Sequence, residues 1–142
     1  MMKEPNGVAR LKQIADEQGS ADPFNGRGGE ESDIAKFTGC TATVVLITQS
    51  HYFCANSGDS RTVLARSSGS EMCYPLSEDH KPENPIERAR IESAGGFVEE
   101  NRVNGSLALS RALGDFEYKS SADLPYTQQM VTCEPELRTC SR

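Results

Sequence analysis

The chain has 142 residues and carries 21 acidic against 15 basic side chains, which gives a net charge of −6 and a pI near 5.0. This acidic balance argues against a nucleic-acid-binding surface and against a patch that attracts anionic membranes. The sequence holds no run of about 18 apolar residues, so it predicts no transmembrane helix. The length is that of one ordinary domain or of part of a larger one.

The first 36 residues carry little that predicts a packed core. Residues 8–18 predict a short helix with Val8, Leu11 and Ile14 on one face. Residues 19–33 are rich in glycine and polar side chains and are expected to form a loop or linker. We therefore expect two parts, a flexible or partly helical segment of residues 1–36 and a structured domain portion of residues 37–142.

Four strand-like runs follow one another after this segment, at residues 41–48, 51–56, 61–66 and 72–76. The first is rich in β-branched residues without polar alternation, which predicts a strand buried on both faces. The short turn at residues 49–50 predicts an antiparallel hairpin with the second run. Together the four runs predict a meander that packs against a second layer.

A helix is expected next, with Asn84 as its cap, Pro85 at its first position and a stop at Gly95. Glu87 and Arg90 are spaced to pair on its solvent face. Residues 97–103 predict a short strand or hairpin arm. Residues 129–133 predict a strand before Pro135, and the residues after it, up to Arg142, are expected to begin another strand.

Residues 102–119 predict a tightly packed strand-and-turn element. Arg111 lies among apolar neighbours there, so it must reach solvent or find an acidic or carbonyl partner. Asp115, four residues further on, is the partner that the spacing suggests.

The cysteines are irregularly spaced and none forms a C-x-x-C pair: Cys40, Cys54, Cys73, Cys133 and Cys140. The odd count, with no apolar signal core at the amino terminus, favours reduced thiols and an intracellular protein, in the cytoplasm, the nucleus or both. Cys40, Cys54 and Cys73 lie in or beside expected strands and are interpreted as buried apolar side chains. Because both histidines lie far from any cysteine pair, a zinc-binding or metal-storage module is disfavoured.

Two short polar segments carry candidate site residues. Asp59 follows a strand in a Ser-Gly-Asp-Ser turn, where its carboxylate either caps the turn or acts as a ligand for a hard cation such as Mg²⁺ or Mn²⁺. His80 and Lys81 precede Pro82 in a segment that either forms a solvated loop or holds a phosphorylated ligand. The local sequence alone favours the turn cap and the solvated loop, and it identifies no catalytic residue.

Six blocks in a fixed order resemble the type 2C (PPM-type) family of metal-dependent serine/threonine protein phosphatases. They are residues 39–42, 55–61, 76–82, 87–96, 102–119 and 134–136. The resemblance implies an α+β fold, an α-β-β-α sandwich of two antiparallel sheets with helices outside. It also implies hydrolysis of phosphoserine and phosphothreonine in proteins by a water that bridges two Mg²⁺ or Mn²⁺ ions.

The same resemblance assigns roles to the two polar segments. It implies that Asp59 helps to hold a further metal ion beside the binuclear pair. Residues 78–105, which include His80 and Lys81, correspond to a mobile flap that influences substrate choice. The implied partners are phosphoprotein substrates, with no nucleic acid and no membrane, and the complete form is expected to be a monomer.

The resemblance is to the central portion of the catalytic domain. The family's Asp-Gly-His run, which supplies a metal aspartate and a general-acid histidine, is not found in residues 1–38, and further metal segments are expected beyond residue 136. We therefore expect that this chain is a fragment, that it does not assemble the binuclear centre alone, and that it exposes a sheet face and a strand edge. The alternative is a truncated, non-catalytic relative that binds phosphoproteins or a phosphatase.

Overall fold

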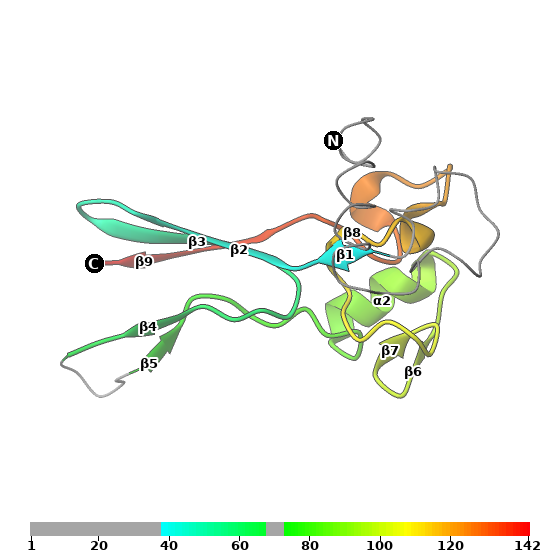
Figure 1. Ribbon diagram of the computed structural model, residues 1–142, viewed down its shortest axis with the longest axis horizontal. Coiled ribbons are helices and arrows are strands. Elements are labelled where there is room, and N and C mark those ends of the chain that lie inside the picture. Colours follow the sequence, from blue (N-terminus) through cyan, green and yellow to red (C-terminus); the bar gives the residue numbers. More distant parts are fainter. Residues whose placement is uncertain (1–37, 68–72) are drawn as a thin grey trace, which may run out of the picture.

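A computed structural model describes residues 38–67 and 73–142. The expected helix at residues 8–18 and the division at residue 36 lie outside these residues. Figure 1 shows two regions, an elongated arm of strands and a compact cluster around helix α2 (Pro85–Ser93). One α-helix with antiparallel sheets gives the described part an α+β architecture, as the sequence predicts.

The arm is built on a three-stranded antiparallel sheet in the order β2-β3-β9. Its strands are β2 (Ala42–Ile47), β3 (His51–Ser57) and β9 (Glu136–Ser141). The predicted hairpin between the first two runs is confirmed, with Ile47 paired with Tyr52. β9 pairs with β3 from His51 to Asn56. The two strands are separated by about 80 residues of sequence, so this pairing brings residues 136–141 back beside the first hairpin.

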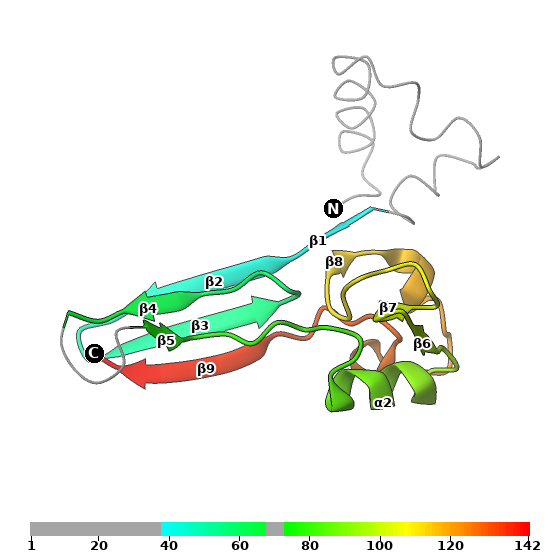
Figure 2. The same cartoon turned by 90° about the horizontal axis from the view of Figure 1, so that it is seen from below.

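The predicted four-strand meander is wrong. Strand β4 (Val63–Ala65) pairs with β5 (Cys73–Pro75) in a separate hairpin, because the place beside β3 is taken by β9. Figures 1 and 2 show this hairpin lying against one side of the three-stranded sheet as a second layer. The hydroxyls of Thr43 and Thr62 meet at 2.7 Å between the layers.

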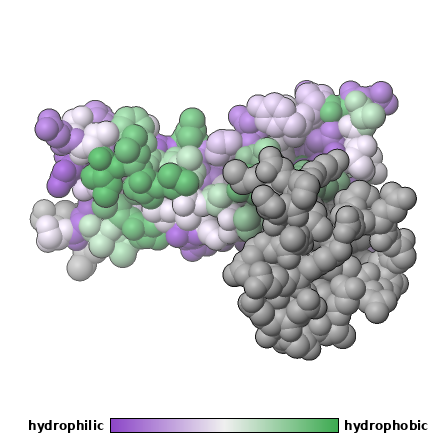
Figure 3. Space-filling view, turned by 45° about the horizontal axis from the view of Figure 1, so that its top comes forward, coloured by the Kyte–Doolittle hydropathy of each residue, from purple (hydrophilic) through white to green (hydrophobic). Residues whose placement is uncertain are grey.

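The opposite face of the three-stranded sheet is exposed. Its outer-face side chains Val44, Leu46, Phe53 and Leu137 are 63%, 59%, 41% and 74% exposed. The prediction that β2 is buried on both faces is therefore wrong, because within residues 38–67 and 73–142 a layer covers one side of the sheet alone. Figure 3 shows apolar side chains gathered over the arm.

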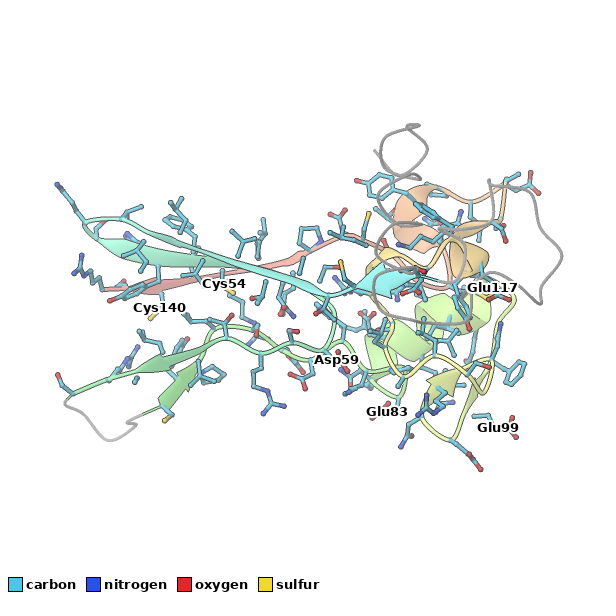
Figure 4. The ribbon with its side chains drawn as sticks, in the orientation of Figure 1. Cys54, Asp59, Glu83, Glu99, Glu117 and Cys140 are labelled. Carbon is cyan, nitrogen blue, oxygen red and sulfur yellow. The ribbon has the colours of Figure 1, made fainter. Side chains whose placement is uncertain are left out.

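Of the three cysteines that were expected to be buried, one is buried and two are exposed. Cys54 is buried in the arm, and in Figure 4 it points, with Cys140, toward the β4-β5 layer. Cys40 and Cys73 are exposed, so the expectation that they are buried is wrong. Both lie in short strands, of two and three residues, at positions that no other described segment covers.

The predicted helix is confirmed as α2. Asn84 has the extended backbone of an N-cap, but its side-chain amide donates to the Asp79 carbonyl instead of capping the helix. Gly95 ends the helix with a φ of +85°, a conformation that glycine adopts without strain. The core beside α2 consists of fully buried side chains from four separate segments: Ile91, Val103, Ala112 and Val131.

Short elements surround this core. They are β1 (Gly39–Cys40), β6 (Val98–Glu99), β7 (Arg102–Val103), β8 (Leu113–Gly114), η2 (Phe116–Lys119) and η3 (Tyr126–Gln128). The packed element predicted at residues 102–119 is confirmed by the pairings of β6 with β7 and of β1 with β8. The hairpin arm expected at residues 97–103 is confirmed as the β6–β7 pair, and the strand start expected at the end of the chain is confirmed as β9. The strand predicted at residues 129–133 is wrong, because a single bridge joins Arg111 to Thr132 there.

Candidate functional site

The candidate site lies at the junction between the arm and the α2 cluster, where residues 56–61 meet residues 78–82. Figure 4 shows Asp59 between the two regions. Gly58 turns the chain out of β3 with a φ of +118°, and a Cβ on it would lie 2.4 Å from the Thr41 side chain. Only glycine fits this turn, which sends Asp59 away from the sheet.

His80 anchors the second segment to this turn. Its backbone N–H donates to the Gly58 carbonyl at 3.1 Å, and the Gly58 N–H donates to His80 Nδ1 at 3.1 Å. Asn56 reinforces the contact by donating to the carbonyls of Gly58 and Glu78. Because Nδ1 accepts a hydrogen bond, the neutral ring carries its proton on Nε2.

The environment of His80 favours this neutral form. The residue is 4% exposed, and burial, together with the nearby charge of Arg111, lowers the pKa of His80 below its ordinary value. A buried neutral imidazole whose Nδ1 is already bonded serves as a structural anchor. The predicted solvated loop at this position is wrong for His80, and a contact between His80 and a substrate stays a prediction.

Two ion pairs flank the His80 anchor. Lys81 Nζ donates to Asp59 Oδ2 at 2.5 Å, and these side chains are 36% and 27% exposed. On the other side Arg61 donates to both carboxylate oxygens of Asp79 at 2.9 Å. The hydrogen bonds from Arg61 lower the pKa of Asp79, although burial opposes this shift.

A buried ionic cluster lies behind the junction and centres on Glu87, whose side chain is 3% exposed. Arg111 Nη2 donates to Glu87 Oε1 at 2.6 Å and Arg90 Nη1 lies 2.7 Å from Oε2. The Ser110 hydroxyl donates to Oε2 at 2.6 Å, and the Ser110 N–H donates to the His80 carbonyl at 3.0 Å. The cluster therefore ties α2, residues 110–111 and the His80 anchor together.

The electrostatics of Glu87 follow from these contacts. Burial raises its pKa, but the hydrogen bonds from Arg111 and Ser110 and the charges of Arg90 and Arg111 outweigh burial and lower the pKa to about 2. Glu87 is therefore ionised at every physiological pH. This carboxylate balances two arginines inside the fold.

Two expectations about these residues need correction. The suggested pair between Arg111 and Asp115 is wrong: Arg111 binds Glu87 and the Glu134 carbonyl, as its apolar neighbours require, while Asp115 packs beside Gly39. Glu87 and Arg90 do pair, but inside the fold and not on the solvent face. The need of Arg111 for a partner was visible in the sequence, but the partner, 24 residues away, was not.

The described residues do not fit a binuclear metal centre on their own. Within residues 38–67 and 73–142, no three His, Cys, Asp or Glu side chains gather in a way that could hold a metal ion. Asp59 offers one carboxylate, and Lys81 already occupies one of its oxygens. The structure brings Asp59, His80 and Lys81 together at one junction, but it does not surround Asp59 with further ligands.

The family model of protein phosphatase 2C matches residues 11–142. The chain belongs to this family. Protein phosphatase 2C homolog 2 of Schizosaccharomyces pombe is 57% identical over 101 residues, which is 70% of this chain and 26% of the relative. Protein phosphatase 2C 1 of Paramecium tetraurelia is 49% identical over 102 residues, which is 72% of this chain and 33% of the relative.

Solved structures support the same assignment. A phosphatase from Toxoplasma gondii aligns with a TM-score of 0.61 at 45% identity, covering 64% of this chain and 28% of that one. A sex-determining protein of Caenorhabditis elegans aligns with a TM-score of 0.58 at 26% identity, covering 96% of this chain and 28% of that one. The resemblance to the type 2C phosphatases is confirmed, and the chain spans about a quarter to a third of the length of these curated relatives.

Within residues 38–67 and 73–142, no helix is long and apolar enough to cross a bilayer.

Proposed function

We propose that this chain contributes to the hydrolysis of phosphoserine and phosphothreonine in phosphoprotein substrates, with Mg²⁺ or Mn²⁺ as the cofactor. The observation that carries the proposal is the match of residues 11–142 to the protein phosphatase 2C family. The high identity to the Schizosaccharomyces pombe relative supports it. The chain spans 26% of that relative, so we propose that it contributes to the reaction and not that it carries out the whole of it.

We propose that the junction between residues 56–61 and 78–82 holds the expected flap, residues 78–105, in a position where it faces the substrate. His80 and Gly58 bond each other in both directions and fix residues 78–82 to the turn at the end of β3. The Glu87 cluster fixes α2 to residues 110–111. Residues 78–105, the expected flap, are thereby fixed at two points, and Lys81 extends from the first of them toward Asp59.

We infer that the chain does not catalyse the reaction alone, because Asp59 is paired with Lys81 and no three metal-ligating side chains gather among the described residues. A chimera tests the family role directly. The 101-residue stretch of the Schizosaccharomyces pombe relative is replaced by the matching stretch of this chain, and Mn²⁺-dependent release of phosphate from a phosphothreonine peptide is measured.

The expected result is that the chimera retains hydrolysis and that Asp59→Ala lowers it strongly. Asp123→Ala, which removes an exposed loop carboxylate, is the matched control and is expected to leave the rate unchanged. A folded chimera without activity contradicts the proposed function, and equal effects of the two substitutions contradict the role of Asp59.

The second candidate function is a non-catalytic module that binds phosphoproteins or a phosphatase. The pairing of Asp59 with Lys81 favours it, because a carboxylate occupied by an ammonium group is not presented to a cation. Fluorescence anisotropy with a phosphothreonine peptide and its unphosphorylated form separates the two. Phosphate-dependent binding by the isolated chain supports the module, and equal anisotropy with both peptides contradicts it.

We also propose an intracellular location, in the cytoplasm, the nucleus or both. The five free cysteines support it, since oxidising compartments favour disulfides. Fractionation of cells that express the tagged chain tests the location, and recovery from the secretory pathway contradicts it.

A further inference from the structure

We propose that Lys81 is the intrinsic counter-cation of Asp59 and that, in this chain by itself, it keeps the carboxylate closed to divalent cations. In the chimera, by contrast, the further metal ligands that the relative supplies compete with Lys81 for Asp59. The inference rests on the proposed function in one respect: it takes Asp59 as the residue that the family resemblance assigns to metal binding. In the structure the Lys81 ammonium bonds Asp59 where the family resemblance predicts a metal ion. The described residues and the family pattern therefore disagree at this carboxylate.

The position of Lys81 is set by its backbone. Its N–H donates to the Asp79 carbonyl at 3.0 Å, and its carbonyl accepts from the Asn84 N–H at 3.1 Å. Pro82, which follows, is fully buried. The side chain therefore starts from a fixed point, and the ion pair with Asp59 follows from the fold.

The position of Asp59 is equally fixed. The reciprocal bonds between Gly58 and His80 join the residues that directly precede Asp59 and Lys81. The two charged side chains consequently leave neighbouring points of one hydrogen-bonded contact. The buried anchor therefore holds the backbones of Asp59 and Lys81 next to each other.

The neighbouring carboxylate cannot complete a cation site. Both oxygens of Asp79 are bonded to Arg61 at 2.9 Å, so Asp79 has its own counter-cation. Divalent cations such as Mg²⁺ need about six oxygen ligands, and a single carboxylate beside an ammonium group offers an incomplete and repulsive site. Each acidic group of this junction therefore has a basic partner from the chain itself.

The ion pair is nevertheless accessible. The side chains of Asp59 and Lys81 are 27% and 36% exposed, so water and small cations reach them. Exposed ion pairs of this kind are weak. Removal of the Lys81 charge is therefore expected to open Asp59 without unfolding the junction.

The test is a Mg²⁺ titration of the full chain, followed by NMR at the backbone amides of Asp59 and Ser60. Lys81→Met is expected to lower the Mg²⁺ concentration for half-maximal shift by about tenfold or more relative to the unmodified chain. Arg88→Met is the control, because it removes one positive charge from an exposed pair with Glu92 on α2 and leaves the Asp59–Lys81 and Asp79–Arg61 pairs intact. Its expected effect is below about twofold, since the removed charge lies outside the junction and is screened by solvent.

Two further variants make the result specific. Adding Asp59→Asn to Lys81→Met is expected to abolish the response, and Lys81→Gln is expected to reproduce it with a polar side chain. Unchanged Gly58 and His80 amide signals show that each variant keeps the junction. The proposal is overturned if Lys81→Met responds like the unmodified chain, if Arg88→Met responds like Lys81→Met, or if the response survives Asp59→Asn.

This outcome is independent of the activity of the chimera. Loss of hydrolysis there refutes the proposed function and leaves the cation measurement unaffected.

Discussion

Replacing Glu87 by glutamine removes the charge on which the buried ionic cluster depends. The pKa of Glu87 is lowered from its ordinary value of 4.5 to about 2. At pH values above 4.5, this shift corresponds to about 3 kcal/mol of folding free energy. Glu87→Gln also leaves Arg90 and Arg111 buried without a carboxylate, a change that costs about 3–5 kcal/mol in proteins. We therefore expect the free energy of unfolding to fall by about 3 kcal/mol or more at pH 7.

The assay is urea unfolding of the full chain, followed by circular dichroism at pH 7 and at successively lower pH. Because the folded-state pKa is depressed, the Glu87 contribution is complete above pH 4.5 and is lost as the pH falls toward 2. The difference between the unmodified chain and Glu87→Gln is therefore expected to shrink over this range.

Glu92→Gln on the same helix is the control. Glu92 pairs with Arg88 at 3.5 Å, and both side chains are about half exposed, so its loss costs below about 0.5 kcal/mol. The reasoning is refuted if Glu87→Gln destabilises the chain no more than Glu92→Gln. It is also refuted if the Glu87→Gln difference is the same at pH 7 and at pH 2.5.

Three further predictions follow from the same structure. Because burial lowers the pKa of His80, its ring is expected to titrate below pH 6.5 by NMR. The stability that depends on the neutral ring is complete above pH 6.5 and is lost as the pH falls from there through the lower folded-state pKa; a midpoint at or above 6.5 contradicts this. Gly114→Ala is expected to cost more than about 2 kcal/mol of unfolding free energy, because φ is +82° and a Cβ there would lie 2.3 Å from a backbone carbonyl oxygen. Gly95→Ala, at φ +85° in open space, is the control and is expected to cost about 1 kcal/mol; equal losses would show that the close contact has no effect. The exposed outer face predicts concentration-dependent association in sedimentation velocity, which the paired substitution of Val44 and Leu46 by threonine is expected to reduce; an unmodified chain that stays monomeric contradicts this.

Local features of the fold were predictable from the sequence. The hairpin of β2 and β3 follows from two strand-like runs with a short turn between them, and α2 follows from Pro85 and Gly95 at its ends. The pairing of β3 with β9 was not predictable, because strand propensity does not identify a partner about 80 residues away. The burial of β2 was wrong for a related reason, since an apolar run does not reveal whether a second layer covers it.

The site was predictable in part. The turn at Asp59 and the need of Arg111 for a partner follow from residue types and their neighbours. The contacts of these residues do not, because Lys81 and Glu87 lie 22 and 24 residues away from their partners. The buried position of His80 was missed because a His-Lys-Pro segment has a polar composition, while the bonds to Gly58 that bury it are set by the fold.

The most direct test of the account is Mn²⁺-dependent hydrolysis of a phosphothreonine peptide by this chain and by its Asp59→Ala variant. Among the described residues, Asp59 is paired with Lys81 and no complete metal centre is present. We therefore predict that neither protein releases phosphate above the protein-free control at any Mn²⁺ concentration. Release that depends on Mn²⁺ and falls with Asp59→Ala would contradict it, because the chain would then build a metal site around Asp59.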